Sequence, residues 1–140
     1  MIFFDTSVLI AASVADHIHH AASLSVYRHA APSNACCGVH NLAEVYAVLT
    51  SIPGPQRISS EQASSAVENV REHLLTVSLD EKEHHAVIKQ AAKLGVVGGT
   101  IYDLLIAHAA MKAKAKIIYT WNIRHFQRFG PEITRLIRTP

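Results

Sequence analysis

Short apolar segments alternate with longer helical segments along this chain, and that alternation constrains its fold more than any other feature. Five segments have the length and composition of buried strands: residues 2–4, 34–38, 75–79, 117–120 and 133–137, the last as a candidate edge strand. Parallel strands need crossover connections, which are usually helices. The order of segments therefore predicts an α/β fold with a parallel sheet.

Helical spacing of apolar residues and capping residues mark the segments between the strands. The expected helices begin near Val8, at Asn41, near Ser59, at Asp80 and near Ile101. Asp5, Thr6 and Ser7 precede the first helix as capping residues. The second helix is expected to stop at the Pro-Gly-Pro sequence 53–55, and Gly95 is expected to stop the fourth.

Length and composition limit the class of protein. A chain of 140 residues, 49% of them hydrophobic, can bury a core without a metal or disulfide, and we expect one domain over residues 1–140. No apolar run reaches the length of about eighteen residues that a membrane span requires, and no basic leader precedes the first strand. Cys36 and Cys37 are adjacent, which disfavours a disulfide between them and matches no zinc spacing. These features predict a protein of the reducing cytoplasm, with no membrane partner.

Charge is distributed unevenly although the formal net charge is only +2. From residue 104 onward, seven lysines and arginines face Glu132 alone, whereas the first 103 residues hold six basic residues and ten acids. A basic surface of this kind either is simply solvated or binds a polyanion such as a nucleic acid.

Three acids share a position that the other acids mostly lack: each lies where the chain leaves a core segment and a helix begins. Asp5 directly follows the first strand, Glu44 lies early in the helix after the second strand, and Asp103 lies early in the helix after the glycine-containing loop 98–100. Ligands of open parallel sheets bind at the carboxyl ends of the strands. We therefore expect these three carboxylates to meet in one cleft.

Helix capping is the alternative explanation for two of these acids. Asn41 with Glu44, and Thr100 with Asp103, both fit the pattern of a capping residue followed three positions later by an acid. An acid near a helix N-terminus is also stabilised by the helix dipole, by about 0.3–1 kcal/mol. Capping gives no evident reason for Asp5, which ends a buried strand where a lone charge is costly. The shared cleft explains all three.

Four sequence blocks together resemble the PIN domain family. The blocks are Ile-Phe-Phe-Asp-Thr-Ser at 2–7, Asn-Leu-Ala-Glu-Val at 41–45, Tyr-Asp-Leu-Leu-Ile-Ala at 102–107 and Thr-Trp-Asn-Ile-Arg-His-Phe at 120–126. In order and length they are similar to the VapC-type toxins of bacterial and archaeal toxin–antitoxin pairs. The resemblance implies a PIN-like three-layer α/β/α sandwich with a central parallel five-stranded sheet.

The same resemblance implies a metal-dependent endoribonuclease that cleaves RNA phosphodiesters with metal-activated water. Asp5, Glu44 and Asp103 match the acids that hold Mg²⁺ or Mn²⁺ in the family. Asn122 stands at or near the position where the fourth block commonly has another acid, and an amide cannot neutralise a second divalent ion. This departure favours a single permanent metal site. A cognate antitoxin and a homodimer are the partners that the resemblance implies.

Further residues beside the acids are candidates for contacts with substrate. Thr6, Ser7 and Thr120 can hydrogen-bond the ligating acids or the scissile phosphate, although helix capping explains Thr6 and Ser7 equally well. Arg124 and Arg128 lie nearest in sequence to the fourth block and can bind the RNA backbone. Because three like charges in one cleft repel, at least one of the acids should have a raised pKa when metal is absent.

Other signals favour structural roles. His17 and His20 have the spacing of metal ligands on a helix, but no neighbouring acid or cysteine completes a set, so exposed polar faces explain them better. Tyr102 and Trp121 can stack on bases, and burial is the simpler expectation for both. His125 has no assigned role.

Two other functions compete with the nuclease. The first is a PIN-like nucleic-acid or protein-binding module in which Asn122 marks a decayed site. The second is a phosphate-transferring aspartate protein with Asp5 as acceptor. It is disfavoured because Ser7 stands where the Asp-x-Asp pattern has its second acid.

Overall fold

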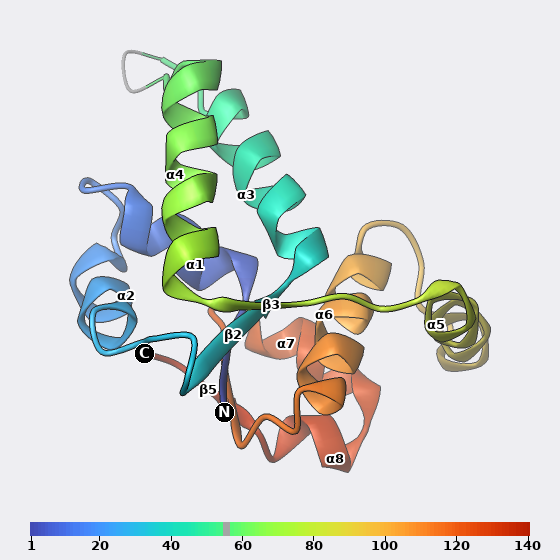
Figure 1. Ribbon diagram of the computed structural model, residues 1–140. Coiled ribbons are helices and arrows are strands. Elements are labelled where there is room, and N and C mark those ends of the chain that lie inside the picture. Colours follow the sequence, from blue (N-terminus) through green and yellow to red (C-terminus); the bar gives the residue numbers. More distant parts are fainter. Residues whose placement is uncertain (55–56) are drawn as a thin grey trace.

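The computed structural model describes residues 1–54 and 57–140 (Figure 1). Its strands form one sheet in the order β3-β2-β1-β4-β5, and every neighbouring pair is parallel. The strands are β1 (Ile2–Phe4), β2 (Ala35–Gly38), β3 (Leu75–Val77), β4 (Ile117–Tyr119) and β5 (Ile137–Arg138). The predicted parallel five-stranded sheet is confirmed.

Helices follow the strands and make the crossovers. They are α1 (Thr6–Ser13), α2 (His20–Tyr27), α3 (Val39–Ser51), α4 (Ser60–His73), α5 (Glu81–Leu94), α6 (Thr100–Lys112), α7 (Ile123–Phe126) and α8 (Pro131–Thr134), with a short 3₁₀ helix at Gln127–Phe129. The predicted stop of the helix that contains Glu44 includes Pro55, which lies outside the described residues. That helix ends at Ser51, just before Pro53.

Two apolar clusters cover the two faces of the sheet because successive strand residues point in opposite directions. Phe3 and Cys36 belong to one cluster, packed under α5, α6, α7 and α8. Phe4 and Cys37 belong to the other, packed under α1, α3 and α4. Figure 1 shows α3 and α4 side by side, extending away from the sheet. Helices on both faces of a central sheet make the three-layer α/β/α sandwich that the resemblance implied.

The strand order places the candidate acids. The chain adds β2 and β3 on one side of β1, and then β4 and β5 on the other. The order therefore reverses between β1 and β4, and loops at the carboxyl ends of the strands diverge there and leave room for a ligand. Asp5 follows β1 at this point, and Thr120 follows β4.

The C-terminal region differs from the prediction. Residues 133–137 do not form a strand: Ile133 lies in α8, and only Ile137 is shared with β5. Pro131 begins α8, where its missing N–H is no loss, and Gly130 precedes it with φ 101°, a left-handed conformation that favours glycine. The edge strand has only two residues and therefore leaves almost no sequence pattern.

Helix starts also differ from the prediction. The helix expected near Val8 begins at Thr6, with Asp5 as its N-cap residue. The helix expected at Asn41 begins at Val39, with Gly38 as its N-cap. Helix α2 was not predicted, because its sequence lacks a clear apolar stripe and buries only Ser23.

The two cysteines are free, as their adjacency predicts, and both are fully buried. Burial raises the pKa of Cys36 to about 11 and that of Cys37 to about 12. Within residues 1–54 and 57–140, no helix has the length and apolar character needed to cross a bilayer.

Candidate active site

Asp5 is the most buried acid of the candidate site. Its residue is 1% exposed, and its Oδ2 accepts hydrogen bonds from Ser7 Oγ (2.5 Å) and Thr120 Oγ1 (2.7 Å). The Ser7 backbone N–H lies 3.4 Å from the same oxygen, so Asp5 caps α1. This confirms Asp5 as a capping residue, and the expectation that capping gives no reason for its position is wrong. Burial raises the pKa of Asp5, and these hydrogen bonds oppose that shift.

Ser7 and Thr120 also join β1 to β4 across the point where the strand order reverses. Thr120 is fully buried, and its Oγ1 accepts a hydrogen bond from the Asn122 backbone N–H at 2.9 Å. Ser7 Oγ accepts one from the Trp121 backbone N–H at 3.0 Å. Each hydroxyl thus donates to Asp5 and accepts from the segment after β4. Both act as positioning groups for a buried carboxylate.

Glu44 is tied to the start of α1 through a chain of hydrogen bonds. The Gly38 backbone N–H donates to Asn41 Oδ1 (2.8 Å), and Asn41 Nδ2 donates to Thr6 Oγ1 (2.8 Å). The Thr6 hydroxyl donates to Glu44 Oε2 (2.7 Å). Asn41 is fully buried in the third position of α3, so it is not the N-cap predicted for it. It orients Thr6, and Thr6 orients Glu44.

Asp103 lies in the first turn of α6, with a side chain 13% exposed. Thr100 is the first residue of that helix and Gly99 is its N-cap, so the predicted Thr100 cap does not form. Burial raises the pKa of Asp103 to about 6. The negative charge of Asp5 adds to this shift, the hydrogen bond to His125 opposes it, and Glu44 contributes last. Repulsion among the acids predicts a raised pKa; its largest cause in the structure is burial, to which the charges of Asp5 and Glu44 add.

The same three acids do not form a ready ligand set. Among the described residues, no three histidine, cysteine or carboxylate side chains are gathered closely enough to hold a metal ion. Two of the acids are engaged elsewhere: Glu44 with Thr6, and Asp103 with His125. Like charges without a counterion separate, and each takes a nearby donor instead. The role of these acids as metal ligands stays a prediction.

Two histidines for which the sequence pattern indicated no role flank the acids. His125 Nδ1 lies 2.9 Å from Asp103 Oδ2. His40 Nε2 lies 3.8 Å from Glu44 Oε1, is buried, and has no hydrogen-bond partner in the described part of the chain. Both histidines lie in or beside the resemblance blocks, and this is the only signal that marked them.

The two aromatic residues behave differently from each other. Tyr102 is 46% exposed and stacks on His40 with ring centroids 4.8 Å apart, so the expectation that it is buried is wrong. It sits in the first turn of α6, directly before Asp103. Trp121 is half-buried: it stacks on His19 at 3.7 Å, and its Nε1 donates to Ser23 Oγ at 2.9 Å.

Asn122, Arg124 and Arg128 are exposed, in contrast to the buried Thr120 that begins the fourth block. Asn122 is the N-cap residue of α7 without a side-chain cap bond, and it lines a shallow cavity together with Arg124 and His125. Arg128 lies in the 3₁₀ helix beyond α7 and is not part of that lining. The structure thus brings Asn122 and Arg124 near Asp103 through His125, and leaves Arg128 on the neighbouring surface.

Comparison with known proteins agrees with this architecture. The model of the PIN domain matches residues 2–130. Ribonuclease VapC27 of Mycobacterium tuberculosis is 34% identical over 113 residues, which cover 81% of this chain and 79% of that protein. Ribonuclease VapC40 of the same species is 30% identical over 122 residues, or 84% of each chain.

Solved structures share the fold at lower identity. VapC20 of M. tuberculosis, described as a sarcin-ricin loop cleaving toxin, has a TM-score of 0.73 at 14% identity and covers 89% of this chain and 92% of its own. VapBC2 of Rickettsia felis, bound to a DNA fragment from its promoter, has a TM-score of 0.65 at 20% identity and covers 99% of this chain and 98% of its own. The family match over most of the chain, together with these relatives, shows that the chain belongs to the PIN domain family and is of its VapC type.

Proposed function

We propose that this chain is an endoribonuclease toxin of a toxin–antitoxin pair and that it hydrolyses RNA phosphodiesters with the help of Mg²⁺ or Mn²⁺. The observation that carries the proposal is the placement of Asp5 after β1, Glu44 in α3 and Asp103 in the first turn of α6, where Asp5 and Glu44 both help to raise the pKa of Asp103. Relatives named as VapC ribonucleases support the reaction class. Acids with a raised pKa, as Asp5 and Asp103 have here, are typical of catalytic sites.

The donor set fits a hard divalent cation in its chemistry. Asp5, Glu44 and Asp103 would hold the ion, since Mg²⁺ and Mn²⁺ prefer oxygen ligands and keep several waters. A bound ion would neutralise charge on the phosphate and make a water more acidic. Asn122 adds no negative charge, which favours a single permanent ion.

The chain's own groups position the acids for this task. The hydroxyls of Ser7 and Thr120 hold Asp5, and the Thr6 hydroxyl holds Glu44. Their hydrogen bonds support the part of the prediction in which these three residues orient the ligating acids. Contact with the scissile phosphate stays a prediction for all three. The imidazole of His125 offers Asp103 a partner in place of a metal ion.

Substrate and partner follow from the surface and the relatives. Arg124 and Arg128 are exposed, and we propose that they bind the RNA backbone. Structures of VapBC complexes from R. felis and Haemophilus influenzae support a cognate antitoxin as the protein partner of this chain. The homodimer and the cytoplasmic location stay predictions.

Cleavage of RNA tests the proposal directly. We expect purified protein to cut single-stranded RNA with Mg²⁺ or Mn²⁺, EDTA to abolish the cutting, and Asp103→Asn to lower kcat at least a hundredfold. Glu72→Gln, an exposed acid on α4, is the matched control and should cut normally. RNA cleavage in EDTA at the same rate as with Mg²⁺ or Mn²⁺ would overturn the role of the metal.

A binding module without catalysis is the second candidate, and the absence of a preformed ligand set among the described residues favours it. In that case the protein would bind RNA or the antitoxin, and neither metal nor Asp103→Asn would change the integrity of the RNA.

A further inference from the structure

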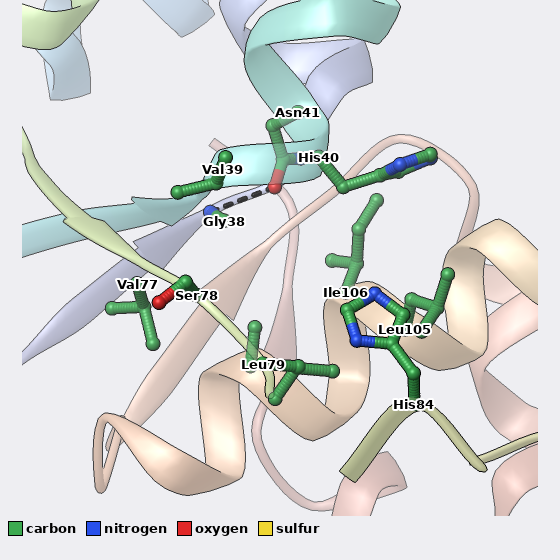
Figure 2. Close-up of a pocket in the computed structure, with 11 residues that line it drawn as sticks. Gly38, Val39, His40, Asn41, Val77, Ser78, Leu79, His84, Leu105 and Ile106 are labelled. Atoms are coloured by element: carbon green, nitrogen blue, oxygen red, sulfur yellow. Dashed lines mark hydrogen bonds between the residues drawn. The ribbon is translucent and has the colours of Figure 1, made fainter. Parts of the chain in front are cut away.

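A pocket of about 230 Å³ lies next to the candidate acids, at the same edge of the sheet. Figure 2 shows its lining, which comes from the ends of β2 and β3, the start of α3, and helices α5 and α6. Its walls are mostly apolar, with two imidazoles among them; the main contributors are Val77, Leu79, Leu105, Ile106, His40 and His84. The pocket is therefore an apolar slot with a few polar groups, which is typical of ligand sites.

One wall of the pocket is fixed by a network around Lys112. Its Nζ donates to the Ser78 carbonyl at 2.9 Å and to Glu83 Oε2 at 2.6 Å. The same Glu83 oxygen accepts from the Asp80 backbone N–H at 2.6 Å. These bonds pin the connection between β3 and α5 to the end of α6. The slot is thus preformed, and little ordering is needed when a ligand enters.

The pocket shares residues with the candidate active site. His40 lines it, lies 3.8 Å from Glu44, and stacks on Tyr102, which directly precedes Asp103. Asn41 also lines it and orients Glu44 through Thr6. A phosphate bound at the acids would therefore have its neighbouring nucleotide within reach of the slot.

Size and polarity distinguish between possible occupants. Pockets for drug-sized ligands hold about 300–1,000 Å³, so a slot of 230 Å³ suits one planar ring system rather than a helix or a folded partner. Single-stranded RNA is recognised through bases that are splayed out, stacked and hydrogen-bonded at their edges. Exposed Tyr102 on His40 offers a stacking surface at the border of the slot.

His84 supplies a polar group with a defined direction. Its Nδ1 lies 2.9 Å from the Asp80 carbonyl oxygen, which can only accept, so Nδ1 carries the proton. In the neutral ring Nε2 is then an acceptor. Figure 2 shows the His84 ring between Leu79 and Leu105.

We propose that this pocket binds one nucleobase of the RNA beside the cut bond, and that His84 Nε2 accepts a hydrogen bond from that base. The inference rests on the nuclease function proposed above and adds a determinant of sequence preference to it. An apolar side chain of a protein partner is the competing occupant.

Cleavage of a short unstructured RNA library, randomised around the cut and analysed by sequencing of the ends, tests the proposal. Wild-type protein should prefer one base at one position. His84→Leu should lower the ratio of kcat/KM for that base over the others by about three- to tenfold, the usual worth of one hydrogen bond. His85→Leu changes the next residue, which is also exposed but lies outside this pocket, and should keep the preference.

Two further variants of the experiment sharpen the result. Ser78→Trp fills the mouth of the slot while keeping the backbone carbonyl that Lys112 holds, and it should also erase the preference. Removing the hydrogen-bond donor from the favoured base should lower kcat/KM of the wild-type protein by the same three- to tenfold. The same change of substrate should not lower kcat/KM of the His84→Leu protein further, because both changes remove the same hydrogen bond. Melting temperatures of all variants verify that they are folded.

Three outcomes overturn the proposal. They are the absence of any base preference in wild type, a preference that survives both His84→Leu and Ser78→Trp, and a loss of antitoxin binding in those variants with unchanged RNA preference.

Binding of an eight-nucleotide RNA to the Asp103→Asn protein, followed through backbone amide NMR signals of Ser78 and Leu105, separates this proposal from the nuclease proposal. Shifts of these signals without any wild-type cleavage would retain the base pocket and reject the nuclease. Cleavage by the wild-type protein without such shifts would retain the nuclease and reject the base pocket.

Discussion

The hydroxyl of Thr120 donates a hydrogen bond of 2.7 Å to Asp5 Oδ2, across 115 positions of the chain. This bond joins the ends of β1 and β4, and both residues are buried. A carboxylate removed from water depends on such donors, since burial alone raises the pKa of Asp5. The candidate site and the fold are thus stabilised by the same contact.

Replacing Thr120 with valine keeps the shape and removes the donor. We expect Thr120→Val to lower the free energy of unfolding at pH 7 by about 1–3 kcal/mol, because Asp5 and the Asn122 N–H each lose a partner. Urea unfolding measures the change. Thr76→Val on β3, away from the acids, is the control. A loss no larger than that of the control would show that other donors satisfy Asp5.

Metal-free protein should become less stable as the pH rises through the titration of Asp103. The folded-state pKa of about 6 lies above the ordinary value of about 3.9, so the folded protein holds the proton more tightly. The stabilising effect is complete below the unfolded-state pKa and is lost as the pH passes 6. Between pH 4 and pH 7 the loss is on the order of 2–3 kcal/mol. Unfolding in EDTA, compared with Asp103→Asn, isolates this contribution, and parallel curves for the two proteins would contradict it.

Divalent metal should raise the melting temperature, because it relieves the repulsion among the acids and binds only the folded state. We expect this shift for Mg²⁺ or Mn²⁺ and expect it to disappear largely in Asp5→Asn. Glu72→Gln should keep it. Thermal unfolding with and without the ion measures the effect. An equal shift in Asp5→Asn would remove Asp5 from the metal site.

Thr6 is expected to orient Glu44 through the hydrogen bond of its hydroxyl. Loss of its hydroxyl in Thr6→Val should lower activity and metal affinity by about 10–100-fold, as changes behind a metal ligand commonly do. Thr6→Ser retains the donor and should restore most of both. Calorimetric titration of metal distinguishes positioning of Glu44 from a general loss of stability. Unchanged metal affinity in Thr6→Val would exclude the positioning role.

Salt should weaken RNA cleavage if the basic C-terminal region binds the RNA backbone. Each phosphate contact contributes about −0.7 to the slope of log affinity against log salt for single strands. Replacing both Arg124 and Arg128 with glutamine should therefore flatten the salt dependence of kcat/KM. Replacing Lys89 and Lys93 of α5 with glutamine removes the same number of positive charges, and should leave the salt dependence of kcat/KM unchanged. A flat response in wild type would mean that these charges serve solubility alone.

Local patterns were sufficient for most of the architecture. The alternation of strands and helices predicted the parallel sheet, and the position of Asp5 after β1 predicted an acid at its carboxyl edge. They failed at β5 and α2, where two residues and an even mix of small side chains carry almost no periodic signal. Such elements form because the rest of the fold offers them partners.

The sequence by itself determined which residue types reach the edge of the sheet: neighbouring strand residues direct their side chains to opposite faces, and Asp5 and Thr120 directly follow β1 and β4. Only the tertiary structure decided the pairings there, such as Thr6 with Glu44 and His125 with Asp103, and the burial that raises the pKa of Asp103. The physical reason is the distance along the chain over which each kind of interaction acts. Periodicity acts over one or two helical turns, whereas these contacts join residues tens of positions apart and depend on how strands align and helices rotate against the sheet.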